Sequence, residues 1–306
     1  MATLLKQLPD NQGDTGIGLS FHEDGICVAC PHSVEGPTEN GLPLTVDFFP
    51  ARGADVQVRL LQKLASRHSL RSLPATIVMN PASYRLLQVP IPQVQQSEID
   101  SALRWQIRDL VDMDVEDAII LSYPMPGQGR PSSPLLFVVV AERNAVTRAV
   151  EMASDAGIKV VSVTTVELAL RTLLGVVEKS EQPSLLLAIF PEKTFLIHVV
   201  NGELYRTREL DYGAAHLPGS GGGAEDGSWP QRLVTEVGRF VLFCGRHCEQ
   251  GSAQRLLVPS IVTKLPELSA QLAEETGIAV EQFSPCPVDP HCLPALGAAC
   301  NGMGGG

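Results

Sequence analysis

The sequence predicts an α/β protein made of two related lobes, and three observations support this prediction. With 306 residues the chain is long enough to bury a large core and to form two domains or one two-lobed fold. Apolar runs of strand length recur along the sequence, and segments with apolar residues at helical spacing follow them. This order of strands first and helices after occurs twice, and the second series starts near residue 183.

The first lobe is expected over residues 15–182, with an inserted subdomain at about 73–142. Within the subdomain, Ser97 and Asp100 have the spacing of a helix N-terminus, so a helix is expected to begin there. The other elements expected in this lobe are a hairpin at 15–30, strands at 44–49, 75–79, 84–89, 118–123, 135–141 and 159–163, and helices at 54–70, 143–156 and 165–177.

The second lobe is expected over residues 183–300. A segment of glycine, serine and acidic residues at 213–228 is expected to be too polar and flexible to pack, and residues 301–306 are expected to be a disordered tail. The elements expected in this lobe are strands at 185–190, 194–200, 203–210, 256–258 and 279–283, a long helix after residue 228, and helices at 265–275 and 293–300.

Composition and charge argue against several classes of partner. The net charge of −11 makes a nucleic-acid backbone or an anionic membrane surface a poor partner, and the aromatic content of 5% argues against base stacking. Residues 1–14 lack the apolar core of a signal peptide, and no stretch approaches the roughly 20 apolar residues that a membrane span needs. We therefore expect a cytoplasmic protein with no nucleic-acid partner and no membrane span.

The seven cysteines are expected to be reduced thiols, since their number is odd and no ligand spacing organises them. Cys27 and Cys30 form a CxxC pattern, but they fall in a predicted strand, where residues three apart point to opposite faces. Cys244 continues an apolar helical stripe, and Cys292 lies in a proline-rich tail. The sequence predicts no metal site, and a metal or redox role for the cysteines remains the alternative.

The common catalytic patterns are absent from the sequence. It contains no GxxxxGK[ST] phosphate loop and no GxSxG nucleophile motif. His198 lies in an apolar strand and is expected to be a satisfied core or surface histidine. Glu23 and Asp24 lie in a predicted turn, where solvated carboxylates are the ordinary case. No catalytic residues are therefore predicted.

The stretch 73–126 carries a more specific pattern. It contains a strand ending in Val89-Pro-Ile-Pro, a helix over 97–111 that includes Trp105, and an acidic link from Asp114 to a strand ending at Tyr123. This order resembles the PilM group of type IV pilus assembly proteins, and the resemblance extends over about 15–283. Within that group the chain is most similar to MshI-like proteins of the mannose-sensitive haemagglutinin (MSHA) pilus. The cytoplasmic part of the type II secretion protein GspL shares the fold of the group.

The resemblance implies an actin-like ATPase fold: two lobes, each built on an RNase H-like mixed sheet flanked by helices. It also implies a cytoplasmic scaffold that is recruited to the inner membrane by a partner. The partner implied is a PilN- or MshJ-like pilus assembly protein, bound through its N-terminal tail, beside other platform or secretion ATPase components.

PilM-type proteins bind ATP through three loops, and this sequence departs from each. The first loop corresponds to 16–21, which has no acid, and the second to 188–194, where only Thr194 is retained. In the third loop, Pro259 and Ser260 replace a pair of glycines, so the backbone approaches phosphates less closely and loses an N–H donor. We therefore expect a non-catalytic protein without a bound cofactor. The alternatives are an active ATPase with atypical loops and a GspL-like component of type II secretion.

The residues expected to contact the partner lie in the inserted subdomain. They are Leu86 and Val89 on a strand, and Arg104, Trp105 and Arg108 on the following helix. Core packing within the lobe is the competing interpretation of Trp105, and solvation is the competing interpretation of the two arginines.

Overall fold

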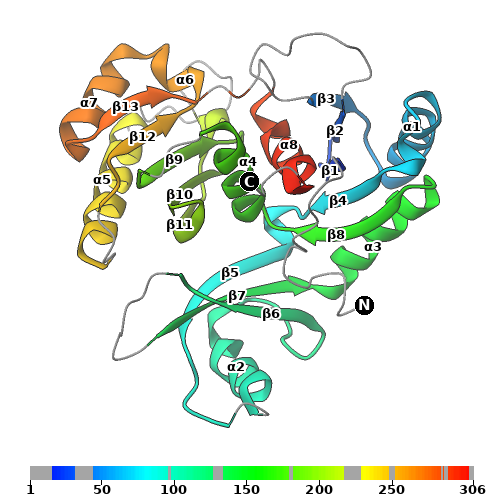
Figure 1. Cartoon of the computed structure of the whole chain (residues 1–306), viewed down its shortest axis with the longest axis horizontal. Coiled ribbons are helices and arrows are strands. Elements are labelled where there is room, and N and C mark those ends of the chain that lie inside the picture. The colour runs from blue at the N-terminus through cyan, green and yellow to red at the C-terminus, as the bar shows by residue number, and fades with distance from the viewer. Residues whose placement is uncertain are drawn as a thin grey trace.

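The computed structural model describes residues 16–31, 44–95, 98–126, 134–178, 182–216, 229–247, 252–283, 285 and 289–302. These residues form two five-stranded sheets with the same topology and one three-stranded sheet (Figure 1). In both large sheets, three antiparallel strands are followed by two strands parallel to the central one. The predicted pair of related lobes is therefore present.

The sheet of the first lobe has helices on both faces. Its strand order is β3 (Leu44–Pro50), β2 (Gly25–Pro31), β1 (Ile17–Phe21), β4 (Pro74–Val78) and β8 (Lys159–Thr164). Because side chains alternate along a strand, Ile17 and Leu19 pack toward α1 (Ala54–Arg67) and α3 (Arg143–Asp155). The opposite face packs against α4 (Val166–Val177) and α8 (Leu293–Ala299).

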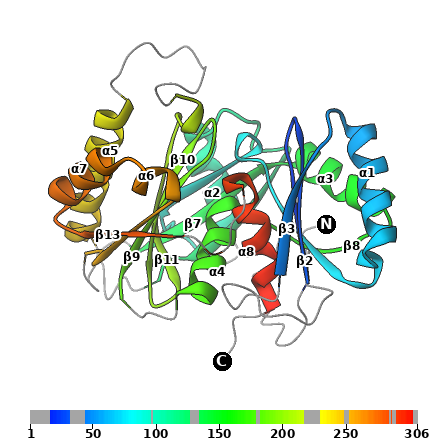
Figure 2. The same cartoon turned by 90° about the horizontal axis from the view of Figure 1, so that it is seen from above.

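The sheet of the second lobe repeats this arrangement. Its strand order is β11 (Glu203–Leu210), β10 (Thr194–Val200), β9 (Ser184–Ile189), β12 (Arg255–Val258) and β13 (Ala279–Gln282). One face is covered by α5 (Trp229–His247) and α7 (Pro266–Thr276), and the short α6 (Ser260–Thr263) follows β12. The other face shares one apolar core with α4 and α8, which lie between the two sheets (Figures 1 and 2).

The inserted subdomain is a three-stranded sheet with one helix. Its strand order is β5 (Tyr84–Pro90), β7 (Leu135–Glu142) and β6 (Ala118–Pro124), and α2 (Ile99–Ile107) covers one face. Val138 and Val140 pack toward α2, whereas Phe137 points to the opposite face and joins the core around α4. The subdomain is thus fixed to the body by one face of its sheet. The expected capping residue Ser97 lies outside the described residues.

The position of α8 requires a correction to the predicted lobe boundary. The sequence assigns residues 293–300 to the second lobe, but α8 packs on β1, β2 and β4 of the first lobe and along α4. Two glycines permit this close packing, since a Cβ on Gly18 would overlap the carbonyl oxygen of Ala295, and one on Gly297 would overlap that of Ala169. Periodicity finds the helix but does not show which sheet it covers.

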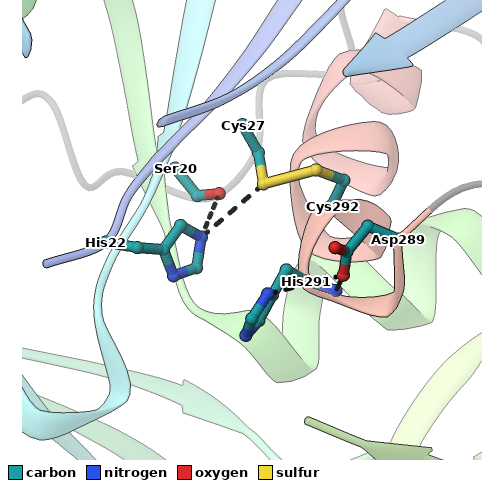
Figure 3. The surroundings of a disulfide bond; sticks show 6 residues. All are labelled: Ser20, His22, Cys27, Asp289, His291 and Cys292. Carbon is teal, nitrogen blue, oxygen red and sulfur yellow. Dashed lines mark hydrogen bonds and ion pairs between the residues drawn. A yellow bond between two sulfur atoms is a disulfide. The ribbon is translucent and has the colours of Figure 1, made fainter. Parts of the chain in front are cut away.

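The expectation of reduced cysteines is wrong for one pair, because Cys27 and Cys292 form a disulfide bond (Figure 3). The two residues are 265 positions apart in the sequence. They meet because the start of α8 packs against β2, so spacing along the chain gave no sign of the pairing. Among the described residues, Cys30, Cys244 and Cys300 are outside the disulfide.

Two predicted flexible segments are partly ordered. Within 213–228, residues 214–216 form a short 3₁₀ turn whose backbone N–H groups at Ala214 and Ala215 donate to the carbonyls of Phe190 and Pro191. Residues 217–228 lie outside the described residues. In the tail predicted at 301–306, Asn301 belongs to a 3₁₀ turn and accepts a hydrogen bond from the Thr172 hydroxyl, whereas residues 303–306 lie outside the described part.

Candidate functional site

A cavity of about 570 Å³ lies between the two lobes. The turns of the two equivalent hairpins, β1–β2 and β9–β10, face each other across it. The end of β4 with the 3₁₀ turn that follows it (Pro81–Ser83), the start of α4 and the start of α8 complete the wall. Its lining includes Ser20–Asp24, Val78–Ala82, Val166, Phe190–Lys193, Phe195, His291 and Pro294.

The first hairpin turn places two acidic residues at the cavity. The expected nucleotide loop at 16–21 did not include them. The run 16–21 has no acid, but Glu23 and Asp24 follow at the turn and line the cavity. Both side chains are exposed, as expected for solvated turn carboxylates. Burial and the neighbouring His291 lower the pKa of His22 to about 4, so its ring is neutral at pH 7.

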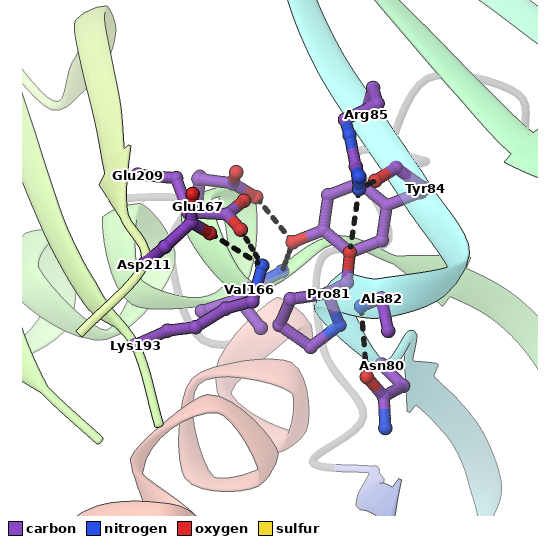
Figure 4. Close-up of polar contacts among 10 residues, drawn as sticks. All are labelled: Asn80, Pro81, Ala82, Tyr84, Arg85, Val166, Glu167, Lys193, Glu209 and Asp211. Carbon is purple, nitrogen blue, oxygen red and sulfur yellow. Dashed lines mark hydrogen bonds and ion pairs between the residues drawn. The ribbon is translucent and has the colours of Figure 1, made fainter. Parts of the chain in front are cut away.

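The polar side chains of Lys193 and Thr194, at the second hairpin turn, are engaged in contacts within the protein. Lys193 is paired with Glu209 and Asp211 of the adjoining strand and its end (Figure 4). Thr194, the residue retained from the expected loops, is fully buried, and its hydroxyl donates to the carbonyl of Tyr212 at 2.8 Å. This hydroxyl is therefore a structural hydrogen-bond donor within the second lobe.

The strand ends of the second lobe are covered by apolar residues where the third loop is expected. Pro259 follows β12, and together with Phe190, Phe283, Pro290 and Leu293 it surrounds a void of about 10 Å³. A void of this size holds about one water molecule. The described residues that line it contribute no hydrogen-bonding side chain.

A buried polar pair lies beside the cavity, at the junction of the inserted subdomain and α4 (Figure 4). The hydroxyl of Tyr84 donates to Glu167 Oε2 at 2.7 Å and accepts the backbone N–H of Val166 at 3.1 Å. Burial raises the pKa of both Tyr84 and Glu167. The pair fixes β5 to the first turn of α4, and both of its buried side chains are hydrogen-bonded.

The sequence analysis did not predict the Tyr84–Glu167 pair. The available signal was Glu167 itself, an acid in the first turn of an otherwise apolar helical segment, where Thr165 forms the N-cap. Nothing in the sequence connects it to Tyr84, which lies 83 positions earlier.

The predicted contact residues separate into exposed and buried groups. Trp105 is 79% exposed on α2, which contradicts its packing in the core. Val89 is 2% exposed and belongs to the core under α2, so its expected direct contact with a partner requires correction. Leu86 is half-buried and packs on the opposite face of the sheet.

The two arginines of α2 make intramolecular contacts. Arg104 donates to the backbone carbonyl of Val115 and so holds the helix against the segment leading to β6. Arg108 forms an exposed ion pair with Glu116 at 3.7 Å. Exposed pairs of this kind contribute little to stability, so Arg108 is available to exchange its partner.

His198 is not satisfied, contrary to expectation. It is fully buried on β10, and neither ring nitrogen has a hydrogen-bond partner within the described part of the chain. Burial, assisted by the nearby Arg206, lowers the pKa of His198 to about 4. Its ring packs edge-on against Tyr205, away from the interlobe cavity.

Neither a metal site nor a membrane helix is found in the part of the chain that the structure describes. Its histidine, cysteine and acidic side chains form no group of three or more able to hold a metal ion. Its helices are all too short or too polar to cross a bilayer.

Comparison with known proteins defines the fold. No family model and no curated protein matches the sequence. Among solved structures, the PilM–PilN type IV pilus biogenesis complex has a chain with 18% identity and a TM-score of 0.69, covering 94% of this chain and 98% of that one. The cytoplasmic domain of EpsL, an inner membrane component of the type II secretion system of Vibrio cholerae, has 11% identity and a TM-score of 0.49, with coverage of 79% and 80%. A Bacteroides thetaiotaomicron protein with an actin-like ATPase fold and unknown function has 7% identity and a TM-score of 0.48, with coverage of 88% and 91%. The chain has the actin-like ATPase fold that its resemblance to the PilM group implies.

Proposed function

We propose that this protein is a non-catalytic scaffold of a type IV, MSHA-type pilus or a related secretion platform at the inner membrane. It binds the N-terminal tail of a PilN- or MshJ-like membrane partner through the inserted subdomain. The likeness to the chain of a PilM–PilN complex over nearly its whole length supports the choice of platform. The single observation that carries the binding role is the exposure of Trp105.

The surface around Trp105 is suited to partner contact. A tryptophan exposed to 79% leaves a large apolar ring in water, although the opposite face of the same helix is packed through Leu103 and Ile107. Arg108 lies one turn further on and Leu110, which is 54% exposed, follows in the adjoining 3₁₀ turn. Tryptophan and arginine are the residues most enriched among those that dominate binding energy.

The absence of catalysis is proposed from the cavity between the lobes. Lys193 is already paired, and among the described residues no other lysine or arginine lines that cavity. A triphosphate placed there would also face Glu23 and Asp24, and without a free cation its charge would be poorly stabilised. In this proposal the actin-like lobes serve as a rigid support for the subdomain. The protein works at the cytoplasmic face of the membrane, to which its partner recruits it.

Binding of synthetic tail peptides to the full-length protein tests the proposal. The peptides are the N-terminal tails of the membrane pilus and secretion proteins encoded beside this chain, so the test also separates the type II secretion alternative. Trp105→Ala should weaken binding at least about tenfold, because truncating a central aromatic contact removes on the order of 2 kcal/mol. Leu242→Ala is the matched control, since Leu242 is 61% exposed on α5 in the other lobe. Failure of every tail to bind, or equal loss in both variants, would contradict the proposal.

An active ATPase is the second candidate, favoured by the size of the interlobe cavity and by the acids of its first turn. Calorimetry with Mg-ATP distinguishes the two. The scaffold proposal expects no heat of binding at micromolar nucleotide, whereas a micromolar affinity that is lost in Asp24→Asn would establish the alternative.

A further inference from the structure

The Cys27–Cys292 disulfide lies next to the interlobe cavity. Cys27 is on β2, and Cys292 is the last residue of the 3₁₀ turn η6 (Pro290–Cys292), which leads directly into α8. Both side chains are almost completely buried. The residue before Cys292, His291, lines the cavity, as does His22. The two imidazole rings lie near the disulfide with their centroids 5.4 Å apart (Figure 3), and neither cysteine lines the cavity in the part of the chain that the structure describes.

The surroundings of Cys27 fit both the bonded and the reduced state. His22 Nε2 lies 3.0 Å from the hydroxyl of Ser20 and 3.7 Å from Cys27 Sγ (Figure 3). A neutral imidazole accepts a hydrogen bond through one of its nitrogens. The Ser20 hydroxyl can supply that bond when the disulfide is intact, and the Cys27 S–H can supply it after reduction. The reduced thiol therefore does not become an unpartnered buried group.

The disulfide fixes the turn before α8, which makes fewer stabilising contacts than α8 itself. The body of α8 is packed by Gly18 and Gly297, but η6 is a single turn supported by Asp289, whose side chain accepts the His291 N–H at 3.0 Å. The covalent bond thus secures the end of α8 that borders the cavity. Pro294 in the first turn of α8 also lines it.

We propose that Cys27 and Cys292 are a reversible thiol–disulfide exchange site, whose oxidation state controls how firmly the start of α8 closes the interlobe cavity. In the bonded state, η6 is fixed to the first lobe. In the dithiol state, η6 opens more often and the cavity becomes more accessible from that side. The inference is independent of the partner surface around Trp105.

The exchange consumes two molecules of a small thiol. The thiolate of the first attacks Cys292 Sγ during an opening of η6, the bond between the protein sulfurs breaks, and Cys27 leaves as a thiolate that takes a proton. The second thiolate attacks the mixed disulfide, and Cys292 leaves and is protonated in turn. One small-molecule disulfide is released, and two electrons pass to the protein.

Hydrogen exchange and thermal unfolding of the full chain, oxidised and after reduction by a small thiol, test the proposal. Reduction should accelerate amide exchange in residues 289–296 about tenfold or more and should lower the Tm by roughly 5–10 °C, because the bond closes a loop of 265 residues. The Cys27→Ser/Cys292→Ser variant should match the reduced protein under both conditions. Cys30→Ser, on the same strand but outside the disulfide, should keep the full response.

Three results would overturn the proposal. The first is complete alkylation of Cys27 and Cys292 in the air-oxidised, denatured protein, which would mean that the bond does not form. The second is equal exchange in residues 289–296 before and after reduction. The third is near-stoichiometric zinc in the reduced protein that the double variant loses, because the pair would then be a metal site.

Discussion

The two lobes share one sheet topology but use it differently. In the first lobe, the connection from β4 to β8 contains the whole inserted subdomain, whereas in the second lobe β12 and β13 are joined by two short helices. The strand ends of the second lobe are covered by Phe190, Phe283 and Leu293. In the first lobe, the hairpin turn instead carries Glu23 and Asp24 to the surface of the cavity.

The two lobes differ mainly outside the core that they share. The sheets and the helices between them are fixed by a common core, so they vary little in arrangement. The crossover connection and the hairpin turns lie outside that core and can change without loss of packing. The first lobe carries the exposed Trp105 surface that we propose for recognition, and the second lobe has apolar residues over its strand ends. Three substitutions probe the first lobe, the junction and the second lobe in turn.

The largest effect is expected in the first lobe, from Gly18→Ala. The new Cβ would overlap the Ala295 carbonyl, so α8 would have to move away from β1. We expect a loss of about 3 kcal/mol or more in the free energy of unfolding, measured by urea denaturation. Gly175→Ala on α4 is the control, because no atom lies near its added Cβ and alanine favours a helix. Equal stability of the two variants would show that α8 is not held by this contact.

An intermediate effect is expected at the junction, from Tyr84→Phe. The variant removes the acceptor of the Val166 N–H and the Tyr84 hydroxyl that donates to the buried Glu167. The free energy of unfolding should fall by about 1–3 kcal/mol. Tyr84→Phe/Glu167→Leu should recover part of this loss, since both polar groups of the pair are then absent. This account would be contradicted if the double variant lost more free energy of unfolding than the two single variants lose together.

The smallest effect at neutral pH is expected in the second lobe, from His198→Leu. Its folded pKa of about 4 is below the unfolded value of 6.5, so the unfolded chain binds more protons and stability falls as pH decreases from 6.5 toward 4. The variant should lose this contribution, which is about 1.4 kcal/mol per pH unit. His22 has the same shift in the first lobe, so part of the slope should remain. An unchanged slope, measured by urea unfolding at several pH values, would refute the assignment.

Much of the fold could be predicted from the sequence because periodicity is a local property. The hairpin around Glu23, the helix of Trp105 and the turn at Asn201 all lie where the pattern of apolar residues places them. The resemblance to a known family supplied the way in which these elements combine. For Trp105 the sequence leaves partner contact and core packing both open, and its 79% exposure excludes core packing.

The features of the site that were missed depend on contacts distant in sequence. Tyr84 meets Glu167, and Cys27 meets Cys292, only after two helices have been placed between the sheets. The unsatisfied ring of His198 likewise results from packing against another strand. No local signal marks such pairs in a single sequence.

The position of α8 also determines the order in which this chain can acquire its structure on the ribosome. The strands β1, β2 and β4 emerge early, but the helix that covers one face of their sheet emerges only after the second lobe. The first lobe therefore cannot complete its folding before the rest of the chain is made. Many proteins, in contrast, fold their N-terminal domain first during synthesis. Until α8 is made, the part of the apolar sheet face that α8 covers remains open to water.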